Sequence, residues 1–144
     1  MMQLAVEQAK QSPPSEGAYC VGAVLAAVDK TLSTATVLAT GFSRELPGNT
    51  HAEECCFIKV REAQLKEARD SHKQLVIYTT MEPCGLRLSG KLPCANRILE
   101  AGYVERVVVA IREPPNFVES CTGAQLLQEK GLAVDFFDSF AGSS

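Results

Sequence analysis

The sequence predicts an α/β protein, a three-layer α/β/α sandwich on a mixed five-stranded sheet, and three observations support this prediction. Five segments rich in Val, Leu, Ile, Thr or Ala have the length of strands. The first two are joined only by residues 30–33, which favours an antiparallel hairpin. After the hairpin, helical segments alternate with strands. Such alternation requires crossover connections, and crossovers make the later strands parallel.

The first half of the chain is predicted to hold a helix, the hairpin and a long helix. Apolar residues recur at helical spacing over residues 2–11, and a Pro-Pro pair ends that helix. Residues 20–29 and 34–42 are predicted to be the hairpin strands. Residues 50–70 lack Gly and Pro and are rich in Ala, Glu, Lys and Leu. They predict one continuous helix of about five turns.

The second half alternates strictly. Strands are predicted at residues 74–80, 106–111 and 132–136. Between them, helices are predicted at 94–101, which Gly102 ends, and at 122–130, which opens with the form of a capping box. The chain of 144 residues, with 46% hydrophobic and 22% charged side chains and no repeat or charge block, fits a single domain over residues 1–144.

The loops after the second and third strands carry the residues of chemical interest. In sheets of this kind, ligands bind beyond the carboxyl ends of strands, where loops meet helix N-termini. The first of these loops leads to His51 and Glu53, and the second contains Cys84 and ends at Cys94. One histidine and two cysteines are three ligands for a tetrahedral Zn²⁺ ion, and the fourth position is left for water, as in catalytic zinc sites.

Glu53 follows the expected ligand histidine by two residues. Zinc lowers the pKa of its bound water toward neutrality. A carboxylate at that place can take a proton from the water and pass it to a leaving amine. The sequence therefore predicts a zinc hydrolase with Glu53 as its proton shuttle.

The pattern His-x-Glu, then Pro-Cys and a second Cys, resembles the signature of zinc-dependent nucleobase deaminases. The chain is similar to the cytidine-deaminase superfamily over almost its whole length. This resemblance implies the superfamily's fold, in which a helix before the last strand makes that strand parallel. It also implies a hydrolytic deaminase.

The inter-cysteine loop narrows the resemblance. Nine residues separate Cys84 from Cys94, where the commonest superfamily form has two. Together with residues 41–53, this long loop resembles the fungal pyrimidine deaminases of riboflavin biosynthesis. The resemblance implies the substrate 2,5-diamino-6-ribitylamino-4(3H)-pyrimidinone 5′-phosphate, which would lose its 2-amino group as ammonia and become 5-amino-6-ribitylamino-uracil 5′-phosphate. Zinc-activated water would attack the ring carbon that bears the amine.

Several residues near the two loops are candidates for substrate contact. Ser43 stands where many superfamily members carry a sugar-binding asparagine, and Asn49 could supply an amide instead. The basic residues are candidates for the phosphate, because arginine and lysine bind such groups. They are Arg87 and Lys91, with Arg44 and Arg112 as comparable alternatives.

Two alternatives concern the proposed site itself. Thr50 and Glu53 also fit a Thr-x-x-Glu capping box, in which Glu53 would only satisfy the helix terminus. Cys55 lies one helical turn after His51 and could act as a rival or fourth ligand, which would give a non-catalytic zinc module. We expect Cys55 to face the core instead. Cys20, Cys56 and Cys121 are expected to be bystanders, and His72, among charged neighbours, to be solvated.

Composition narrows the classes of partner. A net charge of −3, 6% aromatic residues and no tryptophan disfavour binding to nucleic acid. No apolar run could span a membrane and no secretory signal precedes the domain, so we expect a cytoplasmic protein. Members of the superfamily usually form dimers or tetramers, and we expect a homodimer. From its 144 residues we expect a stand-alone deaminase, with any reductase step on another chain. Another small-molecule nucleoside or nucleobase deaminase remains an alternative.

Overall fold

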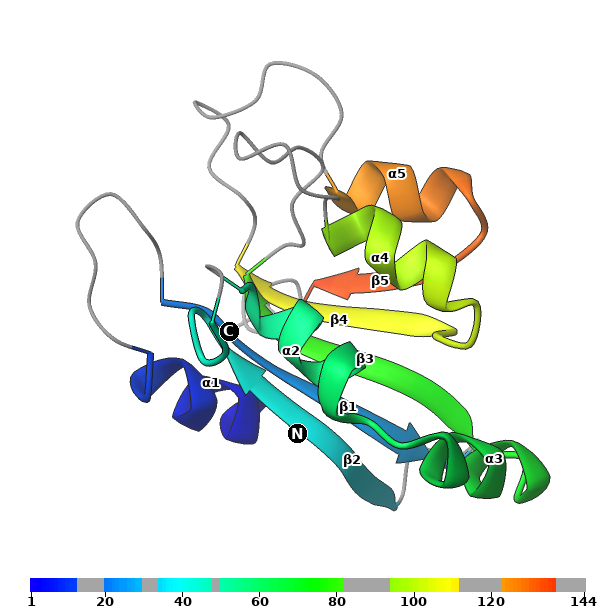
Figure 1. Cartoon of the computed structure of the whole chain (residues 1–144). Helices are drawn as coiled ribbons and strands as arrows, with labels where there is room; N and C mark the ends of the chain where they lie inside the picture. Colours follow the sequence, from blue (N-terminus) through cyan, green and yellow to red (C-terminus); the bar gives the residue numbers. More distant parts are fainter. Residues whose placement is uncertain (13–19, 30–33, 48–49, 82–93, 112–122, 137–144) are drawn as a thin grey trace.

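The computed structural model describes residues 1–12, 20–29, 34–47, 50–81, 94–111 and 123–136. Within these ranges the helices and strands follow one another along the chain as drawn in Figure 1: α1 (Met2–Lys10), β1 (Gly22–Val28), β2 (Ala35–Phe42), α2 (Ala52–Lys59), α3 (Glu62–Asp70), β3 (Gln74–Met81), α4 (Cys94–Ala101), β4 (Arg106–Ile111), α5 (Gly123–Glu129) and β5 (Ala133–Phe136). No helix in these parts of the chain is long and apolar enough to cross a membrane.

The strands form one sheet in the order β2-β1-β3-β4-β5. β1 is antiparallel to both β2 and β3, whereas β4 is parallel to β3 and to β5. The hairpin, the mixed sheet and the parallel last strand predicted from the sequence are therefore confirmed. Because β2 and β3 are both antiparallel to β1, they run in the same direction, and β4 is parallel to β3. The carboxyl ends of β2, β3 and β4 therefore lie along the same side of the sheet.

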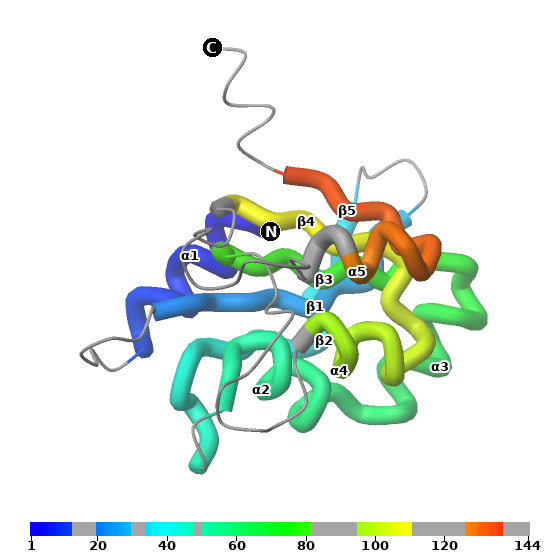
Figure 2. Tube along the Cα trace, turned by 90° about the horizontal axis from the view of Figure 1, so that it is seen from above, coloured from blue at the N-terminus to red at the C-terminus, as the bar shows by residue number. Residues whose placement is uncertain are grey.

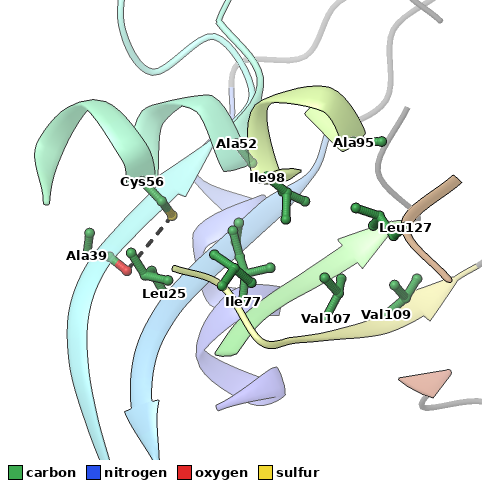
Figure 3. Packing of buried hydrophobic residues seen from close by; sticks show 12 residues of the cluster. Leu25, Ala39, Ala52, Cys56, Ile77, Ala95, Ile98, Val107, Val109 and Leu127 are labelled. Atoms are coloured by element: carbon green, nitrogen blue, oxygen red, sulfur yellow. Dashed lines mark hydrogen bonds between the residues drawn. The ribbon is translucent and has the colours of Figure 1, made fainter. Parts of the chain in front are cut away.

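Helices cover both faces of this sheet, which gives the predicted three layers (Figure 1). Helix α1 packs Met2 and Ala5 on one face, against Val24, Ala26 and Val76. Helices α2, α4 and α5 cover the other face, and α4 lies between α2 and α5 (Figure 2). Buried apolar side chains fill that second interface (Figure 3): Ala23, Leu25, Ala39, Ala52, Cys56, Ile77, Ala95, Ile98, Val104, Val107, Val109 and Leu127.

The predicted single helix over residues 50–70 is wrong, because the chain forms two helices there. Val60, with φ −66° and ψ 141°, and Arg61, with φ −99° and ψ 147°, are extended and separate α2 from α3. The side chain of Gln64 stabilises the break: it accepts a hydrogen bond from Arg61 N–H (2.9 Å) and donates one to Leu38 O (3.1 Å). The break lets α3 turn to cover a separate cluster, formed by Ala27, Leu65, Ala68 and Leu75.

Two glycines let helices approach the sheet closely. A Cβ atom at Gly22 in β1 would lie 1.9 Å from the carbonyl oxygen of Ala5 in α1. A Cβ atom at Gly41 in β2 would lie 2.2 Å from the carbonyl oxygen of Ala52, the first residue of α2. Only glycine fits at such distances, so Gly41 sets how near the start of α2 comes to β2.

Candidate active site

His51 is held in place by a short turn between β2 and α2. It immediately precedes the helix in an extended conformation, with φ −87° and ψ 159°. The hydroxyl of Thr50 donates to Leu46 O (2.9 Å) and accepts from Leu46 N–H (3.0 Å). The N–H of Arg44 donates to Thr50 O (2.6 Å). These bonds fix the backbone that carries His51 to the edge of the sheet where β2 and β3 end.

Glu53 lies in the first turn of α2 with only 4% of its surface exposed. Its Oε2 is 3.5 Å from the hydroxyl oxygen of Thr79, a fully buried residue of β3. That hydroxyl donates a shorter hydrogen bond to Met81 O (2.9 Å). The carboxylate of Glu53 therefore lies beneath the start of α2, beside the carboxyl end of β3.

Glu54, and not Glu53, caps helix α2. The Oε1 atom of Glu54 accepts a hydrogen bond from the backbone N–H of His51 (3.1 Å), which is the reach-back bond of a capping box. The alternative in which Glu53 performs this role opposite Thr50 is therefore wrong, because the helix begins one residue later than that alternative requires. The reach-back bond of the capping box therefore comes from Glu54.

Cys94 is the first residue of α4, and the start of α4 lies beside the start of α2. Ala52 and Ala95, the neighbours of His51 and Cys94 in sequence, belong to the same buried cluster (Figure 3). An ion pair of 3.3 Å between Arg97 Nη2 and Glu54 Oε2 joins the two first turns. Two of the three expected zinc ligands thus belong to helix starts that the fold brings together.

The other expected site residues on the second loop lie outside the described residues. These are Cys84, Arg87 and Lys91, and Asn49, Arg112 and Cys121 lie outside them as well. Within the described part of the chain, no three His, Cys, Asp or Glu side chains are grouped closely enough to hold a metal ion. The residue types at the two helix starts, His51 and Cys94, are nevertheless those that bind catalytic zinc.

Cys55 is a core residue, as expected. It is completely buried, and its Sγ atom lies 3.3 Å from Thr50 Oγ1 and 3.7 Å from Phe42 O, between α2 and β2. Cys56 is equally buried and its Sγ atom contacts Ala39 O (3.9 Å; Figure 3). Burial raises the pKa of the Cys56 thiol far above its usual range, and the nearby carboxylate of Glu53 raises it further. A thiol in that state is inert, which fits a bystander.

Ser43 and Arg44 fasten the turn after β2 to the end of α1. Ser43 is buried, and its hydroxyl oxygen accepts from Val21 N–H (2.9 Å). Arg44 has a positive φ of 62°, and its Nη2 atom donates to Ser12 Oγ (3.1 Å) and contacts Cys20 Sγ (3.8 Å). Both side chains have structural partners, and their contact with a substrate stays a prediction. His72 is exposed, as expected.

Sequence reasoning missed three residues of this region: Thr79, Glu54 and Arg97. Glu54 had a signal, because two successive glutamates follow His51 and only one of them can face the helix terminus. The signal for Thr79 was weaker: polar side chains in a largely apolar strand are typical of buried hydrogen bonds. No sequence signal pointed to Arg97, because its role depends on how α4 lies against α2.

The fold and the residue types at these two helix starts are those expected of a zinc-dependent deaminase. The model of the family described as "Cytidine and deoxycytidylate deaminase zinc-binding region" matches residues 1–111. This match covers most of the chain, and the chain belongs to that family. The superfamily resemblance, the fold class and the assignment to the deaminases are therefore confirmed, and the description of the family names the matched region as zinc-binding.

Individual relatives point to one branch of the family. The chain is 41% identical over 130 residues to a diaminohydroxyphosphoribosylamino-pyrimidine deaminase of Schizosaccharomyces pombe. This match covers 90% of the chain but only 29% of the length of the relative. It matches an Aspergillus oryzae Rib2 deaminase, solved as a C-terminal deletion mutant in complex with DARIPP, with a TM-score of 0.75 and 29% identity over 94% of this chain and 80% of that one. It also matches Acinetobacter baumannii RibD with a TM-score of 0.66 and 29% identity, over 94% of this chain and 33% of that one.

Proposed function

We propose that this chain removes the 2-amino group of 2,5-diamino-6-ribitylamino-4(3H)-pyrimidinone 5′-phosphate by hydrolysis, releasing ammonia. The A. oryzae structure in complex with DARIPP, similar over 94% of this chain, is the observation that carries the proposal. The name of the S. pombe relative supports the same pathway and reaction type. The long inter-cysteine loop supports it independently.

The proposed metal site consists of His51, Cys84 and Cys94. Bound there, zinc would supply a Lewis acid that makes a water molecule nucleophilic at neutral pH. The starts of α2 and α4 favour this arrangement, since the positive end of a helix dipole helps to keep a cysteine thiolate deprotonated.

Glu53 is proposed to move the protons. Its carboxylate would accept a proton from the attacking water and deliver it to the departing amine, so that ammonia, and not an amide anion, leaves the ring. A proton shuttle has to keep one position through both transfers. The contact with Thr79 (3.5 Å) and the burial of Glu53 support that role.

The mechanism is tested by Glu53→Ala, with Glu67→Ala as the matched control at an exposed position of α3. We expect Glu53→Ala to be folded and zinc-loaded, with kcat reduced by at least about a hundredfold, because general acid–base catalysis contributes on the order of 10² to 10⁴. The Glu67 variant should match the wild type. Normal turnover by Glu53→Ala would remove Glu53 from the mechanism.

The substrate is tested by ammonia release from the ribityl phosphate, measured with protein that contains stoichiometric zinc. The ribosyl analogue and a panel of free nucleosides are assayed separately as alternative substrates. Release from the ribityl compound alone supports the proposal. Release from a nucleoside alone would favour a different branch of the family, and the substrate assignment would then fail.

Further expectations concern the surroundings of the reaction. We expect Arg87, Lys91 or Arg44 to meet the phosphate, and Asn49 or Ser43 the ribityl chain. We also expect a homodimer in the cytoplasm, acting on a small phosphorylated metabolite and not on nucleic acid. Light scattering on the purified protein tests the dimer, and single alanine substitutions of the three basic residues, followed by KM measurements, test the phosphate contacts.

A further inference from the structure

Glu54 makes two bonds that lead to different parts of the proposed zinc site. Its carboxylate is buried, with 6% of the residue exposed. One oxygen accepts from the backbone N–H of His51 (3.1 Å), and the other faces Arg97 Nη2 (3.3 Å). The first bond fixes the residue proposed as the zinc-binding histidine. The second reaches the helix that begins at Cys94.

Arg97 lies on the first turn of α4, three residues after Cys94. Both helices also contribute small or apolar side chains to the same buried cluster, among them Ala52, Ala95 and Ile98 (Figure 3). Apolar contacts of this kind are not directional, so they tolerate sliding or rotation of one helix on the other. A partly buried arginine–carboxylate pair has a preferred geometry and resists such movement.

Zinc binding requires that α2 and α4 keep a fixed position relative to one another. Tetrahedral zinc requires Zn–N distances of about 2.0–2.1 Å and Zn–S distances of about 2.3 Å, with a tolerance of about 0.2 Å. A displacement of α4 against α2 by a fraction of an ångström would move Cys94 out of that range relative to His51. Groups that orient metal ligands are typically worth about 10- to 100-fold in metal affinity.

We propose that the Glu54–Arg97 pair is a positioning device that sets the register of α2 against α4 and so pre-organises the zinc site. The inference rests on the proposed ligands His51 and Cys94. Glu54 and Arg97 touch neither metal nor substrate in this scheme. They act through the backbone of His51 and through helix α4.

The test is zinc affinity, measured by competition with a chromophoric chelator. We expect Arg97→Met to weaken zinc binding by about 10- to 100-fold, because the long apolar side chain keeps the packing but loses the pairing with Glu54. Arg97→Lys retains a positive charge and should recover part of the loss. Glu54→Gln keeps an acceptor for His51 N–H and removes the charge, so it should weaken zinc binding to a similar extent and provides a second variant should Arg97→Met not fold.

Arg106→Met is the matched control. Arg106 forms a comparable, half-buried ion pair with Asp135, between β4 and β5. Arg106 begins β4, so it lies at the amino end of that strand, whereas the proposed zinc site lies beyond the carboxyl ends of β2 and β3. Its loss should lower Tm without changing zinc affinity. If Arg97→Met and Glu54→Gln lower Tm in the same way but bind zinc within about twofold of the wild type, the pair only stabilises the fold and the inference is overturned.

A further pair of variants separates this inference from the zinc site on which it rests. His51→Ala and Cys94→Ser should abolish stoichiometric zinc binding. If they bind zinc as the wild type does, the proposed ligands are wrong and the positioning role fails with them. If they lose zinc while the Glu54 and Arg97 variants keep it, the ligands stand and only the positioning role is overturned.

Discussion

At the residue scale, the arrangement around His51 divides two adjacent glutamates between two tasks. Glu54 closes the helix terminus and meets Arg97, whereas Glu53 lies beneath the helix next to Thr79. A capping glutamate accepts a hydrogen bond from a backbone N–H, so one of its oxygens is already occupied. Capping therefore belongs to Glu54, and the proposed proton transfer is assigned to Glu53.

The sequence singled out Glu53 but could not decide whether it caps the helix or is free of that role. Both Thr50 and His51 can begin a helix, and moving the first residue by one exchanges the roles of Glu53 and Glu54. What decides is the turn before the helix, where the hydroxyl of Thr50 is used by the backbone of Leu46. These hydrogen bonds of Thr50 depend on the path of the turn after β2, and no local sequence pattern predicts that path.

Thr79 gives a prediction at this scale. Thr79→Val keeps the shape of the side chain but removes the hydroxyl that lies 3.5 Å from Glu53 Oε2 and donates to Met81 O. We expect kcat to fall by about tenfold, equivalent to about 1.4 kcal/mol, because the carboxylate loses a neighbour that orients it. KM should stay nearly unchanged, since Thr79 is fully buried and cannot reach the substrate.

The control for Thr79 is its neighbour in the strand. The hydroxyl of Thr80 accepts a hydrogen bond from Gly22 N–H (3.0 Å) and does not face Glu53. Thr80→Val should therefore cost stability, about 1–3 kcal/mol in urea unfolding, with kcat largely retained. Equal losses of kcat in both variants would contradict an orienting role for Thr79.

At the element scale, the long helical pattern over residues 50–70 shows the limit of local reasoning. No Gly or Pro marks the break at Val60 and Arg61, and both flanking segments favour helix. The break is set by packing, because α2 contributes to the large core while α3 covers the cluster around Leu75. A single straight helix could not reach both. The start of α2, where the site lies, was nevertheless predicted to within two residues.

Gly41 connects the packing of α2 to the site. Gly41→Ala would place a Cβ 2.2 Å from Ala52 O and 2.9 Å from Cys55 Cβ, and a helix carbonyl has no room to retreat. We expect destabilisation of about 1–3 kcal/mol, as for other overpacked sites, measured by urea unfolding. We also expect weaker zinc binding, because α2 and with it His51 must shift away from β2.

Gly22→Ala is the appropriate comparison for Gly41→Ala. Its Cβ would meet Ala5 O at 1.9 Å and Ala9 N at 2.4 Å, but these atoms belong to α1 on the opposite face of the sheet. The Gly22 variant should lose stability to a similar or greater extent and retain its zinc affinity per folded molecule. If both variants affect zinc equally, the distance between α2 and β2 does not control the site.

At the scale of the whole molecule, the layout followed from the connections between elements. A short link predicts an antiparallel hairpin and helical crossovers predict parallel strands, so the mixed sheet could be derived before any contact was known. The position of β1 between β2 and β3 could not, because it depends on pairing between residues such as Leu25 and Ile77, far apart in sequence. That pairing brings the ends of β2 and β3, and hence the two loops of the site, to one edge.

The stability of the whole molecule should have an alkaline limit to which Tyr103 contributes. Burial raises the pKa of Tyr103 to about 12, and the neighbouring Cys56 and Glu62 add to the effect. The ring packs edge-on against Phe57, with centroids 6.1 Å apart and an interplanar angle of 75°. In the unfolded chain a tyrosine titrates near pH 10, so the native state holds a proton that the unfolded chain has already lost.

The sign of the effect follows from this difference. Below about pH 10 both states are protonated and the contribution of Tyr103 to stability is complete; it is lost progressively as the pH rises toward about 12. We expect the free energy of unfolding, measured in urea at successive pH values from about 8 to 12, to fall less steeply for Tyr103→Phe than for the wild type, because phenylalanine keeps the ring and has no proton to lose. Tyr78, whose pKa burial also raises, remains in both proteins and leaves a residual decline. Identical slopes for the two proteins would show that the Tyr103 hydroxyl does not control the alkaline limit.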